Sequence, residues 1–158
     1  MTEPLKLFAT RVKPEWIDEY GHMNVAHYIT VCDQATWALW HYVNGDRGID
    51  ERDGHEYIVL ENHVHYINEV SVNTPVHVTT QLLACDDKRF ILFHRMWKSE
   101  NATLSATNEV KALGFNLHER HIETFTPDVC HKLAELQRDH SRLPTPDQAG
   151  RGIALQRR

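Results

Sequence analysis

Residues 18–24, Asp-Glu-Tyr-Gly-His-Met-Asn, combine a carboxylate, an imidazole and a glycine directly before a long apolar segment with helical spacing. The first backbone N–H groups of a helix have no partners within it, and the helix dipole favours negative charge at that end. Asp18 at such an end is suited to act as a base beside an oxygen that becomes negative during a reaction. The alternative is structural, with Gly21 in a tight turn, Asn24 as the helix cap and Asp18 solvated.

The helix after this segment is predicted from apolar positions that recur at alternating steps of four and three residues. These positions are Val25, Ile29, Cys32, Thr36, Leu39 and Val43. Apolar and aromatic residues fill most of the other positions, so we expect a helix that is buried almost all round. Asn44-Gly45 ends it, and a charged loop follows over residues 46–54.

The rest of the chain is dominated by strand patterns. We expect strands over residues 5–12, 57–70, 76–85, 89–98 and 103–115, with short hairpin turns between the last four. In residues 57–70 we expect Ile58, Leu60, Val64, Tyr66 and Val70 on one face, with Glu61, His63, His65 and Glu69 on the other. A second helix is predicted over residues 128–140. Residues 141–158 are poor in apolar side chains and are predicted to form a mobile tail.

The composition of the 158 residues is that of one domain. The net charge of −5 disfavours nucleic acid and anionic membranes as partners. The three cysteines, Cys32, Cys85 and Cys130, are far apart and form no Cys-x-x-Cys pair, so we expect a reduced, cytoplasmic protein. Charged residues interrupt the first twenty positions, and we expect neither a signal peptide nor a membrane span.

The motif and the order of elements resemble the hotdog thioesterases of the 4-hydroxybenzoyl-CoA type. Their pattern Asp-x-x-Gly-His-(Met/Val)-Asn, with Tyr four residues later, is matched here by Asp18, Gly21, His22, Met23, Asn24 and Tyr28. The chain departs from the pattern at Val25, where many members have a second Asn, and at Asp33, where many have Glu. The resemblance implies an α+β hotdog fold over residues 1–140, in which a curved antiparallel sheet wraps around the long helix.

Within that family the chain is most similar to the betainyl-CoA thioesterases of carnitine breakdown. Shorter matches carry this second resemblance: Pro-Glu-Trp-Ile-Asp at 14–18, Glu61-x-His63, Asp-Lys-Arg at 87–89 and His94-x-Met96. The implied function is hydrolysis of a small acyl-CoA to the free acid and CoA. The resemblance also implies a homodimer, and no cofactor is expected because CoA is part of the substrate.

The chemistry of the reaction assigns roles to the motif. Asp18 can activate water or attack the thioester directly, and the sequence does not separate these routes. The backbone amides of Met23 and Asn24 are predicted to bind the developing oxyanion. His22 is predicted to orient Asp18 or to contact the thioester, with a packed turn histidine as the alternative.

Four further residues are candidates for substrate binding. Trp16 and Tyr28 are predicted to offer aromatic faces to a quaternary ammonium acyl group, Trp16 because extended backbone would point it to the same side as Asp18. Glu61 and His63 are predicted to line the pocket, with a solvated or dimer-facing polar stripe as the alternative.

Charged side chains elsewhere raise further possibilities. Lys88 and Arg89 are predicted to hold the CoA phosphates, although charges at strand ends are often only solvated. Asp33 is either a second acid in the site or a partner in a surface ion pair. A metal at His63 and His65 would need a third ligand, and we expect none.

Two other functions remain open from sequence. A hotdog enoyl-CoA hydratase would carry Asn-Pro before the histidine, where this chain has Tyr20-Gly21. A non-catalytic acyl-CoA-binding sensor would usually carry a DNA-binding segment, and no basic patch or helix-turn-helix pattern is found.

Overall fold

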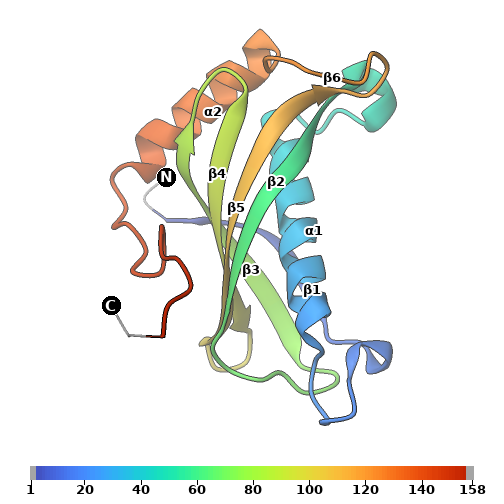
Figure 1. The fold of residues 1–158 in the computed structure, drawn as a ribbon, viewed down its shortest axis with the longest axis vertical. Helices are drawn as coiled ribbons and strands as arrows, with labels where there is room; N and C mark the ends of the chain where they lie inside the picture. Colours follow the sequence, from blue (N-terminus) through green and yellow to red (C-terminus); the bar gives the residue numbers. More distant parts are fainter. Residues whose placement is uncertain (1–2, 156–158) are drawn as a thin grey trace.

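In the computed structural model, residues 3–155 form one strongly curved antiparallel sheet with two α-helices (Figure 1). The strands are β1 (Leu5–Arg11), β2 (His55–Tyr66), β3 (Pro75–Cys85), β4 (Arg89–Lys98), β5 (Thr103–Asn116) and the short β6 (His121–Ile122). The helices are α1 (Val25–Val43) and α2 (Pro127–His140), with 3₁₀ turns η1 (Pro14–Trp16) and η2 (Ile49–Arg52). The order across the sheet is β1-β3-β4-β5-β2, with β6 on β5. The predicted hotdog architecture is confirmed.

Helix α1 lies in the hollow of the sheet because one of its faces is apolar along its whole length. The buried side chains of this helix are Tyr28, Val31, Cys32, Ala35, Thr36, Leu39, Trp40 and Val43. They pack against inward-facing residues of the strands, and α2 closes one end of the same core through Val129, Leu133 and Leu136. This burial supplies most of the driving force for folding, at about 25 cal/mol per Å² of apolar surface.

The prediction that α1 is buried almost all round is wrong for the single protomer. Val25 is 56% exposed and Ile29 is 38% exposed, on the side of the helix that the sheet does not cover. Leu60 in strand β2, whose other edge has no partner strand, is 47% exposed. A partly open apolar stripe therefore follows α1 and β2.

Strand β2 contains a β-bulge at Leu60. Val59 pairs with Ala112, but Glu61 pairs with Lys111, the next residue along β5, so Leu60 has no partner. Because side chains alternate along a strand, the extra residue turns Glu61 to the outer face, away from α1. The predicted face is right for Val64 and Tyr66, which point inward, whereas Ile58, before the bulge, shares the outer face.

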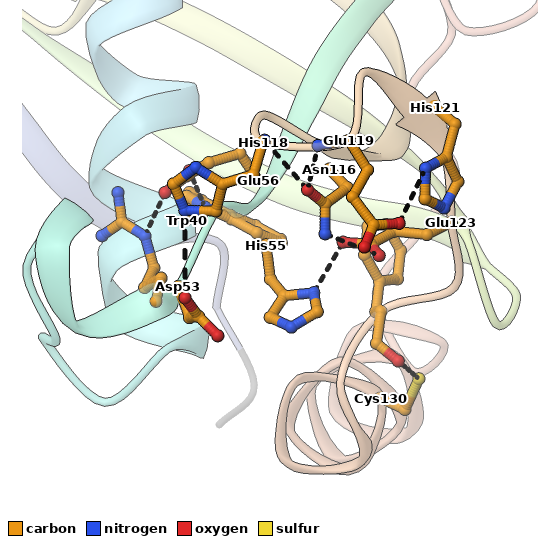
Figure 2. Close-up of polar contacts among 12 residues, drawn as sticks. Trp40, Asp53, His55, Glu56, Asn116, His118, Glu119, His121, Glu123 and Cys130 are labelled. Atoms are coloured by element: carbon orange, nitrogen blue, oxygen red, sulfur yellow. Dashed lines mark hydrogen bonds and ion pairs between the residues drawn. The ribbon is translucent and has the colours of Figure 1, made fainter.

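The C-terminal end of α1 is held by a buried polar network (Figure 2). Arg52 donates to Glu56 at 2.6 Å, and the Trp40 indole donates to the other oxygen of the same carboxylate at 2.7 Å. His55 and Glu123 form a second pair at 2.6 Å nearby. The cavity there has a volume of only about 10 Å³, which is room for about one water molecule. We interpret this cluster as structural, since these hydrogen bonds join α1, η2 and β2 to one another, and Nη2 of Arg52 is the only buried side-chain polar atom of this group that lacks a partner in residues 3–155.

The segment after α2 lies on the outer face of the sheet. Gln81 on β3 donates to the Pro144 carbonyl at 3.3 Å, and the Gly150 amide donates to Glu109 on β5 at 2.7 Å. The mobility predicted for residues 141–158 stays a prediction, and residues 156–158 lie outside the described part. Neither helix in residues 3–155 is long and apolar enough to span a bilayer.

Candidate active site

The motif forms a tight loop that joins η1 to α1. The Asp18 amide donates to the His22 carbonyl and the Gly21 amide donates to the Asp18 carbonyl, each at 3.0 Å. Gly21 adopts a φ of 86°, a left-handed conformation that glycine takes without steric cost. The loop places Asp18 and His22 beside the first turn of α1. The start of α1 lies toward the lower end of the molecule in Figure 1.

The amides of Met23 and Asn24 are not available as oxyanion donors, so this prediction is wrong. The Met23 amide donates to the Val70 carbonyl at 2.8 Å, and the Asn24 amide donates to the Trp16 carbonyl at 2.9 Å. Both bonds fasten the loop to neighbouring segments, and Met23 is also 3% exposed. The two residues therefore build the site without offering a donor to a ligand.

The free donor is the amide of Val25, which sequence reasoning missed. The Asn24 side chain caps α1 by accepting from the Ala26 amide at 3.0 Å, and the backbone carbonyl of Asn24 accepts from the His27 amide at 3.0 Å. Within residues 3–155 no acceptor is found for the Val25 N–H, the first amide of the helix. The signal was present in the sequence, because an Asn cap satisfies the second or third amide and leaves the first one free.

The carboxylates of Asp18 and Glu69 have different partners in this region. Oδ1 of Asp18 accepts from the Tyr20 amide at 2.9 Å, which leaves Oδ2 of this half-buried carboxylate available. Nε2 of His22 lies 3.1 Å from Oε2 of Glu69. His22 is thus paired with Glu69 and not with Asp18, and Glu69 joins the site from the segment that follows β2.

Asp18 and His22 line an open pocket of about 410 Å³ at the N-terminal end of α1. Its walls are Asp18, Tyr20, His22, Met23, Asn24, Val25, Tyr28, Tyr66, Ile67, Asn68 and Glu69. Tyr28, predicted from sequence, is therefore placed in the pocket. Its ring meets that of Tyr66 edge to face, with centroids 5.2 Å apart and planes at 87°.

Hydrogen bonds fix the two tyrosines. The Tyr28 hydroxyl lies 3.4 Å from the Asn68 carbonyl, and the Tyr66 hydroxyl donates to the Val25 carbonyl at 3.2 Å. Burial raises the pKa of the Tyr28 phenol, and the nearby carboxylates of Glu69 and Asp18 raise it further. The phenol of Tyr28 therefore remains neutral at physiological pH.

Trp16 does not line this pocket. The segment before Asp18 forms the turn η1 instead of extended backbone, so the argument that both side chains point to one side does not apply. The Trp16 ring stacks on His27 at a centroid distance of 5.3 Å, and the Lys13 ammonium lies 5.3 Å from its centroid. We interpret Trp16 as a packing residue.

Glu61 and His63 also lie outside the pocket, because the bulge at Leu60 turns both to the outer face. There they line a separate hollow of about 410 Å³, in which Glu61 is 3.1 Å from Lys111. Lys88 lies in the β3–β4 turn and Arg89 is the first residue of β4, where its side chain is bonded to Asp86 at 2.7 Å. Strand β3 begins beside Arg11 and runs eleven residues to this turn, an extended length of roughly 35 Å. The motif is bonded to Val70, shortly before β3, so within one protomer the turn lies at the other end of this strand.

Asp33 is not among the residues that line this pocket. Partial burial in α1 raises the pKa of its carboxyl, and none of the ion pairs found in residues 3–155 includes it. No group of three His, Cys, Asp or Glu side chains able to hold a metal is found among those residues either.

A free amide at a helix N-terminus beside an accessible carboxylate is the arrangement that thioester hydrolysis needs. A family model described as the thioesterase-like superfamily matches residues 12–133. The chain belongs to this superfamily. A betainyl-CoA thioesterase from Pseudomonas aeruginosa is 32% identical over 155 residues, which cover 98% of each chain. An L-carnitine dehydrogenase/betainyl-CoA thioesterase from Rhizobium meliloti is 29% identical over 154 residues, 98% of this chain and 31% of that protein.

Solved structures agree with this assignment. A protein from Staphylococcus aureus, determined in complex with CoA, has a TM-score of 0.87 at 27% identity over 99% of this chain and 98% of that one. A 1,4-dihydroxy-2-naphthoyl-CoA thioesterase from Synechocystis has a TM-score of 0.69 over 82% of this chain and 95% of its own, and at 14% identity it supports the fold alone. The predicted class, a hotdog-fold thioester hydrolase acting on acyl-CoA, is confirmed.

Proposed function

We propose that this thioesterase hydrolyses betainyl-CoA or a closely related short, cationic acyl-CoA, with the reaction centred on Asp18 and the Val25 amide. The observation that carries the proposal is the Val25 N–H at the start of α1, which has no acceptor within residues 3–155 and lies in the same pocket as Asp18, whose Oδ2 has no donor among those residues. The similarity to a betainyl-CoA thioesterase over 98% of both chains supports the choice of acyl group.

In the first route Asp18 acts as a general base. It takes a proton from water as the water oxygen bonds to the thioester carbon, and the carbonyl oxygen becomes an oxyanion bonded to the Val25 N–H. When the tetrahedral intermediate collapses, the C–S bond breaks and the CoA sulfur receives the proton that Asp18 holds. The helix dipole adds to the stabilisation of the oxyanion.

In the second route the Asp18 carboxylate itself attacks the thioester carbon. CoA leaves as a thiol after protonation by water, and a mixed anhydride links Asp18 to the acyl group. Water then hydrolyses the anhydride and regenerates the carboxylate. Both routes use the same residues, and neither needs a metal or a cofactor other than the substrate's own CoA.

His22 and Glu69 form an imidazole–carboxylate pair beside Asp18. The 3.1 Å contact fixes the imidazole ring at the mouth of the pocket, where its other nitrogen can contact the thioester or the CoA sulfur. We assign His22 a positioning role. Glu69 fixes the His22 ring in place. The sequence predicted that His22 orients Asp18, and we replace that role with the His22–Glu69 contact.

A homodimer completes this proposal. Strand β2 is an unpaired edge, and β-sheet edges of this kind pair readily with a second copy. The exposed apolar residues Val59, Leu60 and Tyr66 lie along it, and Ile67 follows its end. Tyr66 is bonded to Val25 of α1, which is also exposed. Because Tyr66 and Val25 also line the pocket, a partner at this edge covers the site. The three cysteines are free, which supports a reducing location such as the cytoplasm.

The test is a panel of acyl-CoAs scored by release of free thiol. Betainyl-CoA is expected to be hydrolysed with a higher kcat/KM than acetyl-CoA, benzoyl-CoA or a long-chain acyl-CoA. Preference for an aromatic or fatty acyl group overturns the cationic substrate and leaves the thioesterase class intact. A single turnover in H₂¹⁸O, with mass analysis of the Asp18 peptide, separates the routes, since only the anhydride route labels the enzyme.

A further inference from the structure

The pocket beside Asp18 is lined by acidic side chains and by no lysine or arginine. Asp18 and Glu69 are among its lining residues, which include neither lysine nor arginine. The Glu69 side chain is 70% exposed at the mouth, while Asp18 lies deeper in the loop. The single imidazole, His22, is already paired with Glu69. Such a wall favours a positively charged ligand over an anionic one.

The same pocket is rich in aromatic surface. Tyr20, Tyr28 and Tyr66 all line it. Tyr28 is 4% exposed and Tyr66 is 44% exposed, so the second ring is the one that an incoming acyl group meets. The perpendicular packing of the two rings fixes the orientation of the Tyr66 face. A quaternary ammonium group binds well against such a face, because its charge interacts with the ring without a need for hydrogen bonds.

Distance within the substrate limits which groups can contact the charge. In a betainyl thioester one methylene separates the ammonium nitrogen from the carbonyl carbon, so the two atoms are about 2.5 Å apart. If the carbonyl oxygen binds the Val25 amide, the cation must lie within a few ångströms of the first turn of α1. The Tyr66 hydroxyl meets that condition, since it is bonded to the Val25 carbonyl at 3.2 Å.

We infer that Tyr66, backed by Tyr28 and assisted by Glu69, forms the subsite for the permanent cation of the acyl group. This inference rests on the proposed function and names residues for it. It replaces Trp16, whose ring is taken up by His27 and Lys13, and Glu61, which lies on the outer face beside Lys111. The subsite is a specificity determinant, and the bond-breaking steps remain with Asp18 and Val25.

The experiment compares betainyl-CoA with 3,3-dimethylbutanoyl-CoA, in which carbon replaces nitrogen at nearly the same shape. Tyr66→Leu is expected to reduce kcat/KM for the cationic substrate roughly two- to thirty-fold more than for the neutral one. Glu69→Gln is expected to give a smaller selective loss of about two- to five-fold, since this carboxylate is largely exposed. Tyr66→Phe keeps the ring and is expected to keep the preference.

Glu19→Gln serves as the matched charge control, because Glu19 is an exposed neighbour of Asp18 that does not line the pocket. Its substrate ratio is expected to equal that of the wild type. Equal losses for both substrates in Tyr66→Leu and in Glu69→Gln overturn the cation subsite. Because Glu69→Gln is nearly isosteric at an exposed position, it gives a result even if Tyr66→Leu fails to fold.

Calorimetric binding separates this inference from the proposed function. In Asp18→Asn, in which turnover is expected to be at least about a hundredfold slower, betainyl-CoA is expected to bind more tightly than the neutral isostere, and adding Tyr66→Leu is expected to remove that difference. Selective binding without hydrolysis by the wild type overturns the proposed function alone. Hydrolysis of both substrates without selective binding overturns the subsite alone.

Discussion

Tyr66 at the end of β2 donates a hydrogen bond to the carbonyl of Val25, the first residue of α1, at 3.2 Å. The contact ties the edge of the sheet to the helix terminus where the only unpaired amide of the first turn within residues 3–155 is found. Val25 supplies the proposed oxyanion donor, and Tyr66 supplies an aromatic ring of the acyl pocket. This hydrogen bond therefore fixes the two residues relative to each other.

Replacing Asp18 by Asn should lower kcat for thioester hydrolysis by roughly 10² to 10⁴ while the fold is retained. The amide can still accept from Tyr20, so the loop keeps its geometry, but it cannot take a proton or attack the thioester. Thiol release and far-UV circular dichroism measure the two properties. Near-normal turnover in a folded Asp18→Asn protein removes Asp18 from the mechanism.

Replacing Asn24 by Ala should destabilise the protein by about 1 kcal/mol and lower turnover as well. The side chain that caps the Ala26 amide is lost, and the first turn that presents the Val25 amide loosens. Urea unfolding gives the change in stability, and Asn24→Asp should restore most of it because aspartate also caps helices. Turnover that is unaffected in Asn24→Ala would argue against the Val25 amide as the oxyanion donor.

Acidification should destabilise the fold through His94. This imidazole is 0% exposed, it contacts Thr36 and Thr80 at 2.9 Å each, and burial lowers its pKa from 6.5 to about 3. Between these pH values the unfolded chain binds the proton that the folded chain rejects. The stabilising contribution of the neutral ring is therefore fully present above pH 6.5 and is lost progressively as the pH falls toward 3.

The free energy of urea unfolding, measured from pH 7.5 to 4, tests this expectation. Other groups titrate in the same range, so the quantity of interest is the difference in slope between the wild type and His94→Gln, which keeps polar atoms but cannot titrate. The slope should be shallower in the variant. Identical slopes would show that His94 is not a source of the acid sensitivity.

Placing a charge on the β2 edge should disrupt the proposed dimer. Leu60→Lys puts an ammonium at an exposed apolar position on the unpaired strand edge, where it opposes pairing with a second copy. Light scattering at micromolar concentration should show a dimer for the wild type and a shift toward monomer for the variant, with reduced activity. Ile122→Lys, at an apolar position of β6 that is also exposed, is the control and should leave the dimer intact. An active wild-type monomer contradicts the proposal.

Local sequence patterns were sufficient to predict the main elements. The helix start at Asn24 follows from a capping residue before an apolar repeat, and the strand meander follows from alternation and turn residues. Asp18, His22 and Tyr28 could be placed near the helix N-terminus for the same reason, since their positions depend on a few neighbouring residues.

The errors concern long-range contacts. The Met23 amide donates to the carbonyl of Val70, which is forty-seven positions away in the sequence. No local pattern predicts that hydrogen bond. Trp16 turns away from Asp18 because Pro14 starts a 3₁₀ turn, and Glu61 turns away because a bulge precedes it. Glu69 enters the site only through the path of the chain after β2.

The unpaired Leu60 has a consequence for sequence variation among relatives of this protein. Loss of Leu60 itself would remove the bulge and leave the pairs Val59–Ala112 and Glu61–Lys111 adjacent in a regular ladder, with Glu61 and His63 still on the outer face. Loss or gain of a residue elsewhere in β2 would instead shift the pairing of the following residues by one position and exchange their two faces. We therefore expect differences in the length of β2 among relatives to be confined to the position of Leu60.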